Sequence, residues 1–312
     1  MVDHSTTDLT DLKVYDLEKR PGGICGQPVV LVTGASTGIG LEIVRRFMSS
    51  GFHVIITARS ESLPRLMQLG FGHEGRNYWV RSLDVCESCD QMRLHDEIQR
   101  RLGRLDVLVN NAAFVHRNKL TDKNGQKLQE HTFRVNFWAP LELIRLFVPL
   151  MAKGSRSYII NICSASAFMP LPTMGIYSAS KQALQTISEV LFHELRECGV
   201  RICVVAPGLV RTESARRQTG LTSGHPVDSL LSWAFYRCRA TPEQVAHFVA
   251  DLVNLKNPPL LSVVTTDAWI LSLFRRLVPS ELYVKFFNLA LILCQKLAGR
   301  DSFPPMSTPA IT

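Results

Sequence analysis

Two residues four positions apart, Tyr177 and Lys181, are the ones in this sequence best suited to moving a proton. The stretch 175–197 has helical spacing of its apolar residues, and side chains four apart on a helix share one face. A phenol has a reference pKa of about 10, so it exchanges a proton poorly at neutral pH unless its anion is stabilised. A neighbouring ammonium would favour the phenolate, and lowering the pKa to about 7 takes about 4 kcal/mol. Such a pair also occurs on ordinary surface helices, so the rest of the chain must decide.

A glycine-rich stretch, Thr-Gly-Ala-Ser-Thr-Gly-Ile-Gly at 33–40, is the second chemical feature. It follows an apolar β-branched run at 28–32, which predicts a buried strand, and precedes a predicted helix at 41–48. Strand, turn and helix form the front half of a βαβ unit, in which glycines let the backbone approach a pyrophosphate at the helix N-terminus. An ordinary tight turn has a similar composition, so this motif alone is weak evidence.

The end of the second predicted strand, 53–57, bears on the choice of dinucleotide. An NAD site carries an acidic residue here for the ribose 2′-hydroxyl, whereas this chain has Ala58 followed by Arg59. A cation without a carboxylate can pair with a 2′-phosphate, so the local chemistry favours NADP(H) over NAD. An exposed arginine after a strand is the alternative explanation.

The elements that must position these residues alternate along the chain. Further strands are predicted at 78–83, 105–109, 157–162 and 200–205, and helices at about 88–102, 125–152 (interrupted by Pro140 and Pro149) and 175–197. Repeated β-α units predict an α/β fold, a Rossmann-type doubly wound parallel sheet flanked by helices. We expect a flexible N-terminal arm at 1–26, one domain at 27–267, a C-terminal helical extension at 268–298 and a flexible tail at 299–312.

In such a sheet, ligands bind beyond the carboxyl ends of the strands. The polar groups at those ends are the glycine-rich turn, Arg59, Asp84, Asn110, Ser164, Pro207 and Gly208. Together with the Tyr177–Lys181 pair they make the chain resemble the short-chain dehydrogenases/reductases, over about 28–267. The motifs that carry the resemblance are Thr33-Gly34-x-x-x-Gly38-x-Gly40, Asp84, Asn110-Asn111-Ala112, Asn136, Ser164, Tyr177-x-x-x-Lys181 and Pro207-Gly208.

The resemblance implies a catalytic set of Asn136, Ser164, Tyr177 and Lys181. Tyr177 would be the general acid in carbonyl reduction or the base in alcohol oxidation, and Ser164 would polarise the substrate oxygen. Lys181 would bind the nicotinamide ribose and lower the pKa of Tyr177, while Asn136 would anchor a water in a proton relay. The cofactor would supply the hydride and the protein the positioning.

The resemblance also implies where NADP(H) would bind. Tyr177 and Lys181 would contact it, and the other expected positions are Gly34, Ser36, Gly38, Ile39 and Gly40 at the diphosphate, Arg59 at the 2′-phosphate, Asp84 and Val85 at the adenine, Asn110 at the adenosine, and Pro207, Gly208 and Thr212 at the carboxamide end. The chain departs from the family pattern at Ala113 and in the stretch Phe137-Trp138-Ala139-Pro140 after Asn136, where glycine is more common, and at Cys163, often a serine. These departures affect packing around the nicotinamide and remove no reacting group.

The implied function is an NADP(H)-dependent oxidoreductase that interconverts an alcohol and a ketone or aldehyde. Apolar residues around Tyr177 and after the sixth strand favour a steroid, retinoid or lipid-like substrate, as in hydroxysteroid and retinol dehydrogenases, although about half could be plain core; they include Phe168, Met169, Leu171, Met174, Leu209 and Val210. A dinucleotide-binding sensor without turnover is the alternative, disfavoured by the intact catalytic set. An epimerase or dehydratase of nucleotide sugars fits less well, because the region after the sixth strand is short.

Composition limits the partners. The formal net charge is +8, but Lys and Arg are scattered, so no nucleic-acid patch is indicated. Eight cysteines, mostly in apolar runs, and no recognisable secretory signal predict reduced thiols and a cytoplasmic location. Cys86 and Cys89 have the spacing of metal ligands, but no second pair lies nearby, and we expect no metal.

The segment 281–298 is apolar nearly all round and is flanked by basic residues. Its longest uncharged run, 286–295, is too short to span a bilayer. The pattern fits either a helix that packs on the protein's own pocket or in a homodimer, or an interfacial helix in peripheral contact with a membrane. The packing interpretation is the one we favour from sequence.

Overall fold

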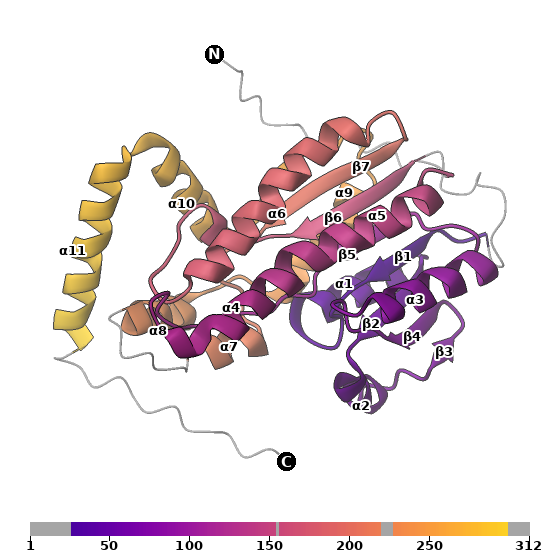
Figure 1. Cartoon of the computed structure of the whole chain (residues 1–312), viewed down its shortest axis with the longest axis horizontal. Coiled ribbons are helices and arrows are strands. Elements are labelled where there is room, and N and C mark those ends of the chain that lie inside the picture. Colours follow the sequence, from indigo (N-terminus) through magenta and orange to yellow (C-terminus); the bar gives the residue numbers. More distant parts are fainter. Residues whose placement is uncertain (1–25, 154–155, 220–226, 299–312) are drawn as a thin grey trace.

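The computed structural model describes residues 26–153, 156–219 and 227–298, which build one sheet covered by helices on both faces (Figure 1). The strand order is β3-β4-β2-β1-β5-β6-β7-β8. The strands are β1 (Val29–Val32), β2 (His53–Ala58), β3 (Glu74–Gly75), β4 (Tyr78–Ser82), β5 (Val107–Asn110), β6 (Ser157–Ile162), β7 (Val200–Ala206) and β8 (Leu261–Val263). Among these described strands, β3 pairs antiparallel with β4 and the other neighbours are parallel. The predicted Rossmann-type doubly wound sheet is therefore confirmed.

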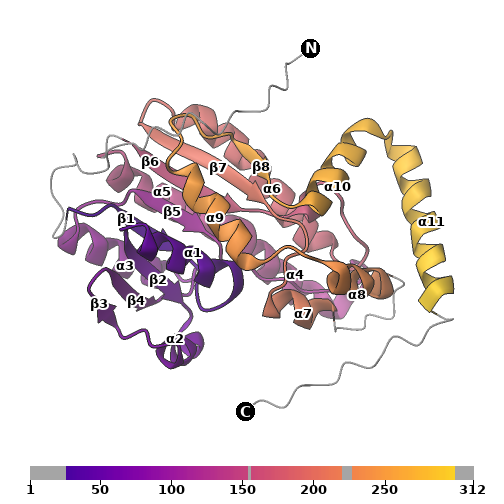
Figure 2. The same cartoon turned by 180° about the vertical axis from the view of Figure 1, so that it is seen from behind.

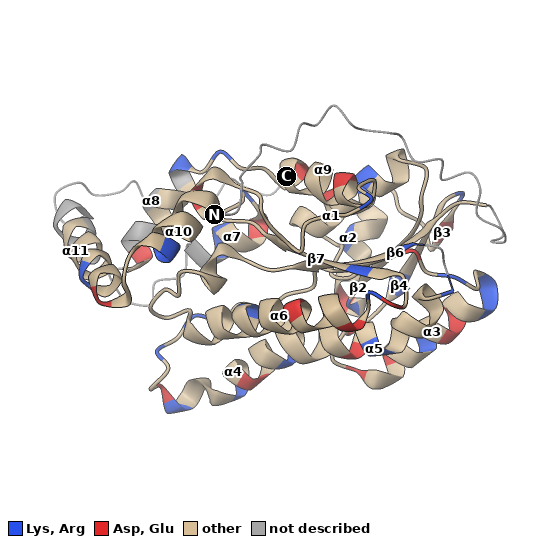
Figure 3. Cartoon of the chain, turned by 90° about the horizontal axis from the view of Figure 1, so that it is seen from above, with Lys and Arg blue, Asp and Glu red and all other residues tan. Residues whose placement is uncertain are grey.

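The central strands carry apolar residues on both faces because helices cover both. Every residue of β1, β2, β5 and β6 is buried. Figure 3 shows α3 (Ser88–Arg101), α4 (Gln126–Phe133), α5 (Ala139–Met151) and α6 (Gly175–Glu194) on one face, with α1 (Gly38–Ser49) and α9 (Pro242–Leu252) on the other. Phe47 and Phe147 are the largest apolar side chains fully buried in these two layers.

The chain turns opposite ways on the two sides of β1. β2 and β5 are the neighbours of β1, and the connections that lead to them cover opposite faces of the sheet. A crevice forms at the carboxyl ends of strands where the order reverses in this way. Gly34 and Asn111, which follow β1 and β5, lie at that point.

The predicted helical stretch at 125–152 is confirmed over most of its length, but its predicted interruption at Pro140 is wrong. A 3₁₀ turn (Lys123–Gly125) leads into α4, and a π-helical turn (Arg134–Trp138) connects α4 to α5. Pro140 interrupts nothing, because it stands at the first turn of α5, where its missing N–H needs no partner. Pro149 lies inside α5 near its C-terminal end.

Further helices lie toward the carboxyl end of the sheet. They are α2 (Leu63–Gln68), between β2 and β3, and α7 (Glu213–Thr219), α8 (Val227–Arg237), α10 (Thr266–Leu277) and α11 (Ser280–Ala298), which follow β7 in the sequence. Figure 2 shows α10 and α11 projecting away from the sheet, with α11 at the margin of the molecule. The predicted arm, apart from Gly26, and the predicted tail lie outside the described residues. None of the helices described is both long and apolar enough to cross a membrane.

The expected packing of 281–298 on the protein's own pocket is realised only in part, and its packing in a homodimer stays a prediction. α11 packs against α8, and Tyr283 is buried, but much of the helix faces outward. Together with α10 it presents an apolar surface, here called the α10–α11 surface, formed by exposed Trp269, Ile270, Leu273, Leu277, Leu282, Val284, Phe286, Leu289, Ile292 and Leu293. Leu282, Phe286, Leu289 and Leu293 follow one another at spacings of four, three and four along one stripe of α11, whereas the exposed residues Val284 and Ile292 lie outside this stripe.

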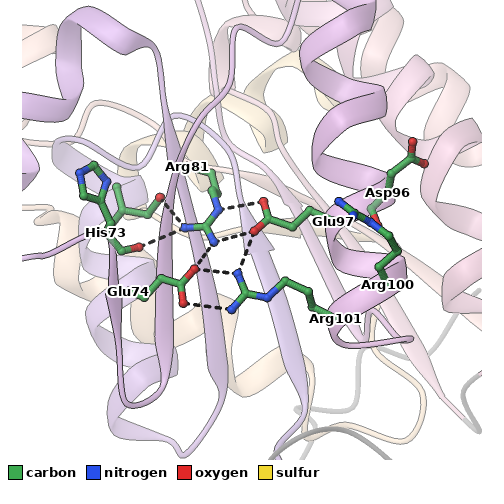
Figure 4. Close-up of polar contacts among 8 residues, drawn as sticks. His73, Glu74, Arg81, Asp96, Glu97, Arg100 and Arg101 are labelled. Atoms are coloured by element: carbon green, nitrogen blue, oxygen red, sulfur yellow. Dashed lines mark hydrogen bonds and ion pairs between the residues drawn. The ribbon is translucent and has the colours of Figure 1, made fainter.

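At the opposite end of the sheet, a network of ion pairs protects the edge formed by β3 and β4 (Figure 4). Arg81 on β4 donates two hydrogen bonds to Glu97 on α3, 2.9 and 2.6 Å long, and also pairs with Glu74. Arg101 donates to both oxygens of Glu74, at 2.7 and 3.0 Å, and lies 4.0 Å from the ring centre of Trp79. The two guanidinium groups hold the pKa of the Glu74 carboxyl at about 2.

Candidate active site

A cavity of about 510 Å³ lies at the carboxyl ends of the central strands. It brings together most of the predicted site residues: Gly34, Ser36, Gly38, Ile39, Gly40, Arg59, Asp84, Val85, Ser164, Tyr177, Lys181, Pro207, Gly208 and Thr212 all line it. Two predicted residues, Asn110 and Asn136, are not among its described lining. These residues are spread over the sequence from Gly34 to Thr212. They come together because the parallel strands that carry them end at the same edge of the sheet.

The glycine-rich turn between β1 and α1 forms one wall of the cavity. Gly34 has φ +63°, and a Cβ there would lie 2.7 Å from the Cα of Ala112, so no side chain fits. Gly38, with φ +57°, begins α1. Thr37 makes no side-chain capping bond, and the first turn of α1 carries no acidic residue. The N–H groups at the start of α1 therefore face the cavity with the chemistry that a diphosphate requires.

Asn111 is a site residue that sequence reasoning named only as part of a motif. Its Nδ2 donates to the carbonyl oxygens of Thr33 (2.9 Å) and Gly34 (3.0 Å). A Cβ on Gly40 would lie 2.4 Å from this nitrogen, so the glycine makes room for the amide. Asn111 thus fixes the glycine-rich turn to the end of β5. Its position directly after a predicted strand could have identified it as a site residue from the sequence.

Asn110 lies in the core instead of in the cavity. Its Nδ2 donates to Asn161 Oδ1 (2.8 Å) on β6, and Asn161 in turn donates to Ser188 on α6 (2.9 Å). Both asparagine side chains are buried. The side chain of Asn110 is therefore directed toward β6 and α6, and its predicted contact with the adenosine stays a prediction.

Asn136 lies in the π-helical turn and is fully buried. Its Oδ1 accepts from the N–H of Phe114 (2.8 Å), and its Nδ2 donates to the Phe114 carbonyl (2.9 Å) and to Ser180 Oγ (3.0 Å). Both N–H bonds of the amide are thus used within the protein. Asn136 holds the segment after β5 against α6; its part in a proton relay stays a prediction.

Tyr177 and Lys181 share the face of α6 that borders the cavity, as their spacing predicts. Ser164 starts a 3₁₀ turn after β6, and its Oγ accepts hydrogen bonds from the N–H (3.2 Å) and Oγ (3.0 Å) of Ser166. The Lys181 ammonium donates to the carbonyl of Ile162 (2.8 Å), which uses one of its three N–H bonds.

Burial dominates the protonation of this pair. It raises the pKa of Tyr177 to about 12, against the effect of a hydrogen bond with Ser164 that lowers it. It lowers the pKa of Lys181 to about 8. The protein alone therefore keeps the phenol protonated at neutral pH. Lys181 is mostly charged at neutral pH, which lies about one pH unit below its pKa. A positive charge close to the phenol would bring its pKa down.

The loop after β7 closes the other side of the cavity. The carbonyl of Pro207 accepts from the N–H of Ala165 (2.8 Å), which ties this loop to the one carrying Ser164. Thr265 and Asp267, at the start of α10, accept from the N–H groups of Gly208 (2.8 Å) and Leu209 (2.9 Å). These two acceptors hold the loop from outside the predicted family motifs.

Charged residues gather at the end of the cavity next to β2. Arg59 is 58% exposed and pairs with Glu61 at 3.1 Å. Two further arginines, Arg65 and Arg217, line the same cavity, and Glu213 pairs with both. The last residue of β2, where an NAD site would carry a carboxylate, is the buried Ala58. The arginines could bind a phosphate.

Apolar residues cover the region around Tyr177. Phe114, Val115, Met174, Leu209 and Val210 line the cavity there. Of the other predicted pocket residues, Phe168 packs with Ala167 and Val204 in a separate small cluster, and Met169 and Leu171 are not among the described lining. No group of three His, Cys, Asp or Glu residues within the described ranges is placed to hold a metal.

Comparison with known proteins matches residues 28–220 to the family model described as "short chain dehydrogenase". This range is more than half of the chain and includes every residue described above as lining the cavity. The chain belongs to the short-chain dehydrogenase family.

Relatives of this short-chain dehydrogenase carry oxidoreductase names. The oxidoreductase DltE of Bacillus subtilis is 34% identical over 229 residues, which cover 72% of this chain and 83% of DltE. The 11-beta-hydroxysteroid dehydrogenase A of Sesamum indicum is 32% identical over 186 residues, which cover 59% of this chain and 53% of that protein.

Solved structures show the same fold. A metagenomic short-chain oxidoreductase in complex with NADP is 29% identical, with a TM-score of 0.60 over 76% of this chain and 96% of that one. A short-chain dehydrogenase/reductase from Burkholderia phymatum in complex with NAD is 21% identical, with a TM-score of 0.69 over 90% of this chain and 98% of that one. A nicotinamide dinucleotide thus accompanies both neighbours, one with the 2′-phosphate and one without.

Proposed function

We propose that this short-chain dehydrogenase interconverts an apolar alcohol and its ketone or aldehyde, with NADP(H) as cofactor. The observation that carries the proposal is the convergence of Ser164, Tyr177 and Lys181 on the cavity that the glycine-rich turn also lines. When bound, NADPH supplies a hydride to the carbonyl carbon. The protein's part is to position the substrate and to supply the proton that the carbonyl oxygen then needs.

Tyr177 is the proton donor in this proposal, because its pKa of about 12 keeps the hydroxyl protonated and ready to donate. Ser164 Oγ donates a hydrogen bond to the same substrate oxygen and stabilises the charge that develops on it. Lys181, with a pKa of about 8, carries a positive charge at neutral pH and favours the phenolate that forms when the proton leaves. In alcohol oxidation, the same groups act in reverse.

NADP(H) is favoured over NAD by the charges at the end of β2. Ala58 provides no carboxylate for a ribose 2′-hydroxyl, whereas Arg59, Arg65 and Arg217 offer guanidinium groups to a 2′-phosphate. The metagenomic relative bound to NADP supports this choice.

An apolar substrate of the steroid, retinoid or lipid class is favoured by the lining around Tyr177, in which Phe114, Val115, Met174, Leu209 and Val210 offer no charge. The Sesamum relative, named a hydroxysteroid dehydrogenase, supports the same class. The alternative is a sensor without turnover. The relatives carry oxidoreductase names, which do not support it.

We further propose that the α10–α11 surface contacts an anionic lipid surface. Its exposed apolar residues include Trp269 and Phe286, and the basic residues Arg275, Arg276 and Lys285 lie between and beside them, with Glu281 as the one acidic residue of 268–298. This composition is typical of helices that lie in a membrane interface. A lipid-like substrate would be available at such a surface.

The test of the activity is an NADPH absorbance assay with four probes: a 3-ketosteroid, all-trans-retinal, decanal and 2-decanone. Turnover of at least one, with NADPH preferred over NADH, is expected. If none of the probes turns over while a small polar ketone does, the substrate class is wrong. If NADPH binds and nothing reacts in either direction, the sensor interpretation gains.

A further inference from the structure

Arg117 is a buried arginine that the catalytic proposal does not use. It lies in the segment between β5 and the 3₁₀ turn at Lys123–Gly125, and its side chain is 1% exposed. Its Nη2 pairs with the carboxylate of Asp228, which is 14% exposed and stands in the first turn of α8. A charge buried to this degree is retained only with charged and hydrogen-bonded partners.

The same guanidinium also holds a strained residue. Its Nε (3.3 Å) and Nη2 (3.1 Å) donate to Thr173 Oγ1, and the N–H of Asn118 donates to the Thr173 carbonyl (3.0 Å). Thr173 has φ +67°, and it is the one non-glycine residue with positive φ in the described ranges. A β-branched residue adopts this conformation only where its surroundings impose it.

Thr173 stands four residues before Tyr177. Its turn continues through Met174 into α6, which begins at Gly175, so the conformation of Thr173 sets how α6 starts. Leu120 packs against Gly175 so closely that a Cβ there would lie 2.9 Å from it. The segment around Arg117 is therefore fitted onto the first turn of α6, the turn that carries Tyr177.

Asp228 connects the arginine to the other side of the cavity. α8 packs against α7, and Glu213, Ser214, Ala215 and Arg217 of α7 line the cavity. At its other end, the segment that carries Arg117 is bound through Phe114 to Asn136, and Phe114 also lines the cavity. Arg117 thus touches both the start of the catalytic helix and the helix that supports the cavity's cover.

We propose that Arg117 is a positioning residue: through Asp228 it fixes α8 and the cover formed by α7, and through Thr173 it fixes the start of α6 and so the place of Tyr177. The inference rests on the proposed function for the role of Tyr177, but not for the coupling of the two segments. Removing the Asp228 charge loosens the cover, which weakens substrate binding. Removing the arginine also releases Thr173, which impairs the proton transfer itself.

The test compares Asp228→Asn, Asp228→Glu and Arg117→Gln. The matched control is Asp106→Asn, which removes another buried carboxylate that pairs with an arginine, Arg104, at the amino end of the central strand β5, away from the cavity. With the best probe of the four named above, Asp228→Asn is expected to raise KM about tenfold with kcat within about threefold, and Arg117→Gln to lower kcat about tenfold as well. Asp228→Glu, which keeps the charge, restores KM to within about threefold. NADPH affinity and the kinetics of Asp106→Asn stay near those of the parent.

A second readout needs no turnover. Trypsin cuts after exposed Arg216 and Arg217 in α7, and Asp228→Asn is expected to accelerate these cuts about tenfold, whereas Asp228→Glu and Asp106→Asn do not. The proposal is overturned if Asp228→Asn is cut at the parental rate, or if Asp106→Asn is cut as fast as Asp228→Asn. Accelerated cleavage in a protein that turns over no probe would preserve the coupling and reject the proposed function.

Discussion

Burial moves the pKa values of Tyr177 and Lys181 in opposite directions, and both shifts disfavour the charged form. The sequence-based argument expected the lysine to depress the phenol's pKa by proximity. In the structure the ammonium donates to the carbonyl of Ile162, and desolvation outweighs the other influences on the phenol. The phenol is therefore an acid that needs further positive charge nearby to release its proton at neutral pH.

Replacing Tyr177 with Phe tests the proton donor. We expect kcat to fall by about a hundredfold to ten-thousandfold or more, the range of general acid catalysis, while NADPH still binds through the glycine-rich turn and Lys181. Steady-state kinetics and NADPH fluorescence titration measure the two effects. Substantial turnover in the purified variant would assign the proton to another group.

Replacing Lys181 with Met tests the buried ammonium by its effect on stability. The unfolded chain binds this proton with the ordinary pKa of 10.5 and the folded chain with a pKa of about 8. Between these values the unfolded state binds more protons, so the free energy of unfolding of the parent rises with pH. Below about pH 8 the parent bears the full cost, and the variant should be more stable by up to about 3 kcal/mol.

The difference should shrink as the pH rises from about 8 toward 10, which urea unfolding of both proteins at several pH values measures. The series ends at about pH 10, because the raised pKa of Tyr177 has the opposite effect on stability above that value. A difference that does not change with pH would show that the ammonium is not desolvated in the folded protein.

Replacing Arg59 with Ala tests the choice of cofactor. We expect NADPH to bind about tenfold more weakly and NADH almost unchanged, a loss at the low end for a charged hydrogen bond because the guanidinium is mostly exposed. Adding Ala58→Asp should shift the preference toward NADH. Equal losses for the two cofactors would place the 2′-phosphate elsewhere, with Arg65 and Arg217 as the next residues to test.

The residues that react could be predicted from sequence because their types and spacing are tied to the reaction. Ser164, Tyr177 and Lys181 need particular functional groups, so their identity carries the signal. Arg117 and Asp228 could not be predicted as a pair, since they are 111 positions apart and become partners only through the fold. Asn110 lies where its motif suggests, but its side chain is directed toward Asn161, a choice made by packing between β5 and β6.

At the scale of elements, the turn after β1 is the one most tightly constrained by its neighbours. Gly34 lies against the backbone of Ala112, which follows β5, so the glycine wall and the adjacent loop fit together without space for a side chain. The close approach involves Ala112 and not the next residue, Ala113. The turn therefore stays intact although the chain has alanine at 113, where the family more often has glycine.

Replacing Gly34 with Ala tests this contact. The new Cβ would meet the backbone of Ala112, which cannot move aside cheaply, and we expect a loss of at least about 2 kcal/mol in the free energy of unfolding, with much weaker NADPH binding. The matched control is Gly199→Ala, where φ is also positive (+72°) but no atom lies within 4 Å of the new Cβ. Similar losses in both variants would attribute the effect to backbone strain alone.

Long periodic elements could be predicted from sequence, and short or irregular ones could not. Four of the six predicted strands, β1, β2, β5 and β6, are buried throughout and have the apolar runs that burial on both faces requires. β3 has two residues and β8 has three, so neither has a periodicity to detect. The π-helical turn at Arg134–Trp138 is set by the contacts of Asn136 with Phe114 and Ser180, which lie far away in the sequence.

At the scale of the whole molecule, the α10–α11 surface is the exposed region that the fold itself leaves unexplained. We expect the full chain to bind vesicles of phosphatidylserine and phosphatidylcholine in a salt-sensitive manner, because exposed apolar residues and Arg275, Arg276 and Lys285 act together. Deleting everything after Val278 should abolish most of this binding and leave turnover of a water-soluble probe intact. Sedimentation with vesicles and a kinetic assay measure the two properties.

A second copy of the chain is the competing occupant of this surface. If the full chain forms a stable dimer that the truncation dissolves, and neither protein binds vesicles, the surface is a subunit interface and the lipid proposal is wrong. Analytical ultracentrifugation of the full-length and shortened proteins distinguishes the two outcomes. The variant Leu289→Ser, which makes one exposed position polar without shortening the chain, provides an intermediate case.

The ion pairs around Arg81 and Arg101 also determine how copies of this protein can meet. An unpaired strand edge is a template for another chain, and a long sheet invites such growth from both sides. Here one edge ends in the two-residue strand β3, which is bordered by Glu74, Arg81 and Arg101, and the other ends in the three-residue strand β8. Neither offers a long row of backbone donors and acceptors to a newcomer. For the described residues, we therefore expect contacts between copies to form through helices, with the sheet edges disfavoured as sites of fibrous growth.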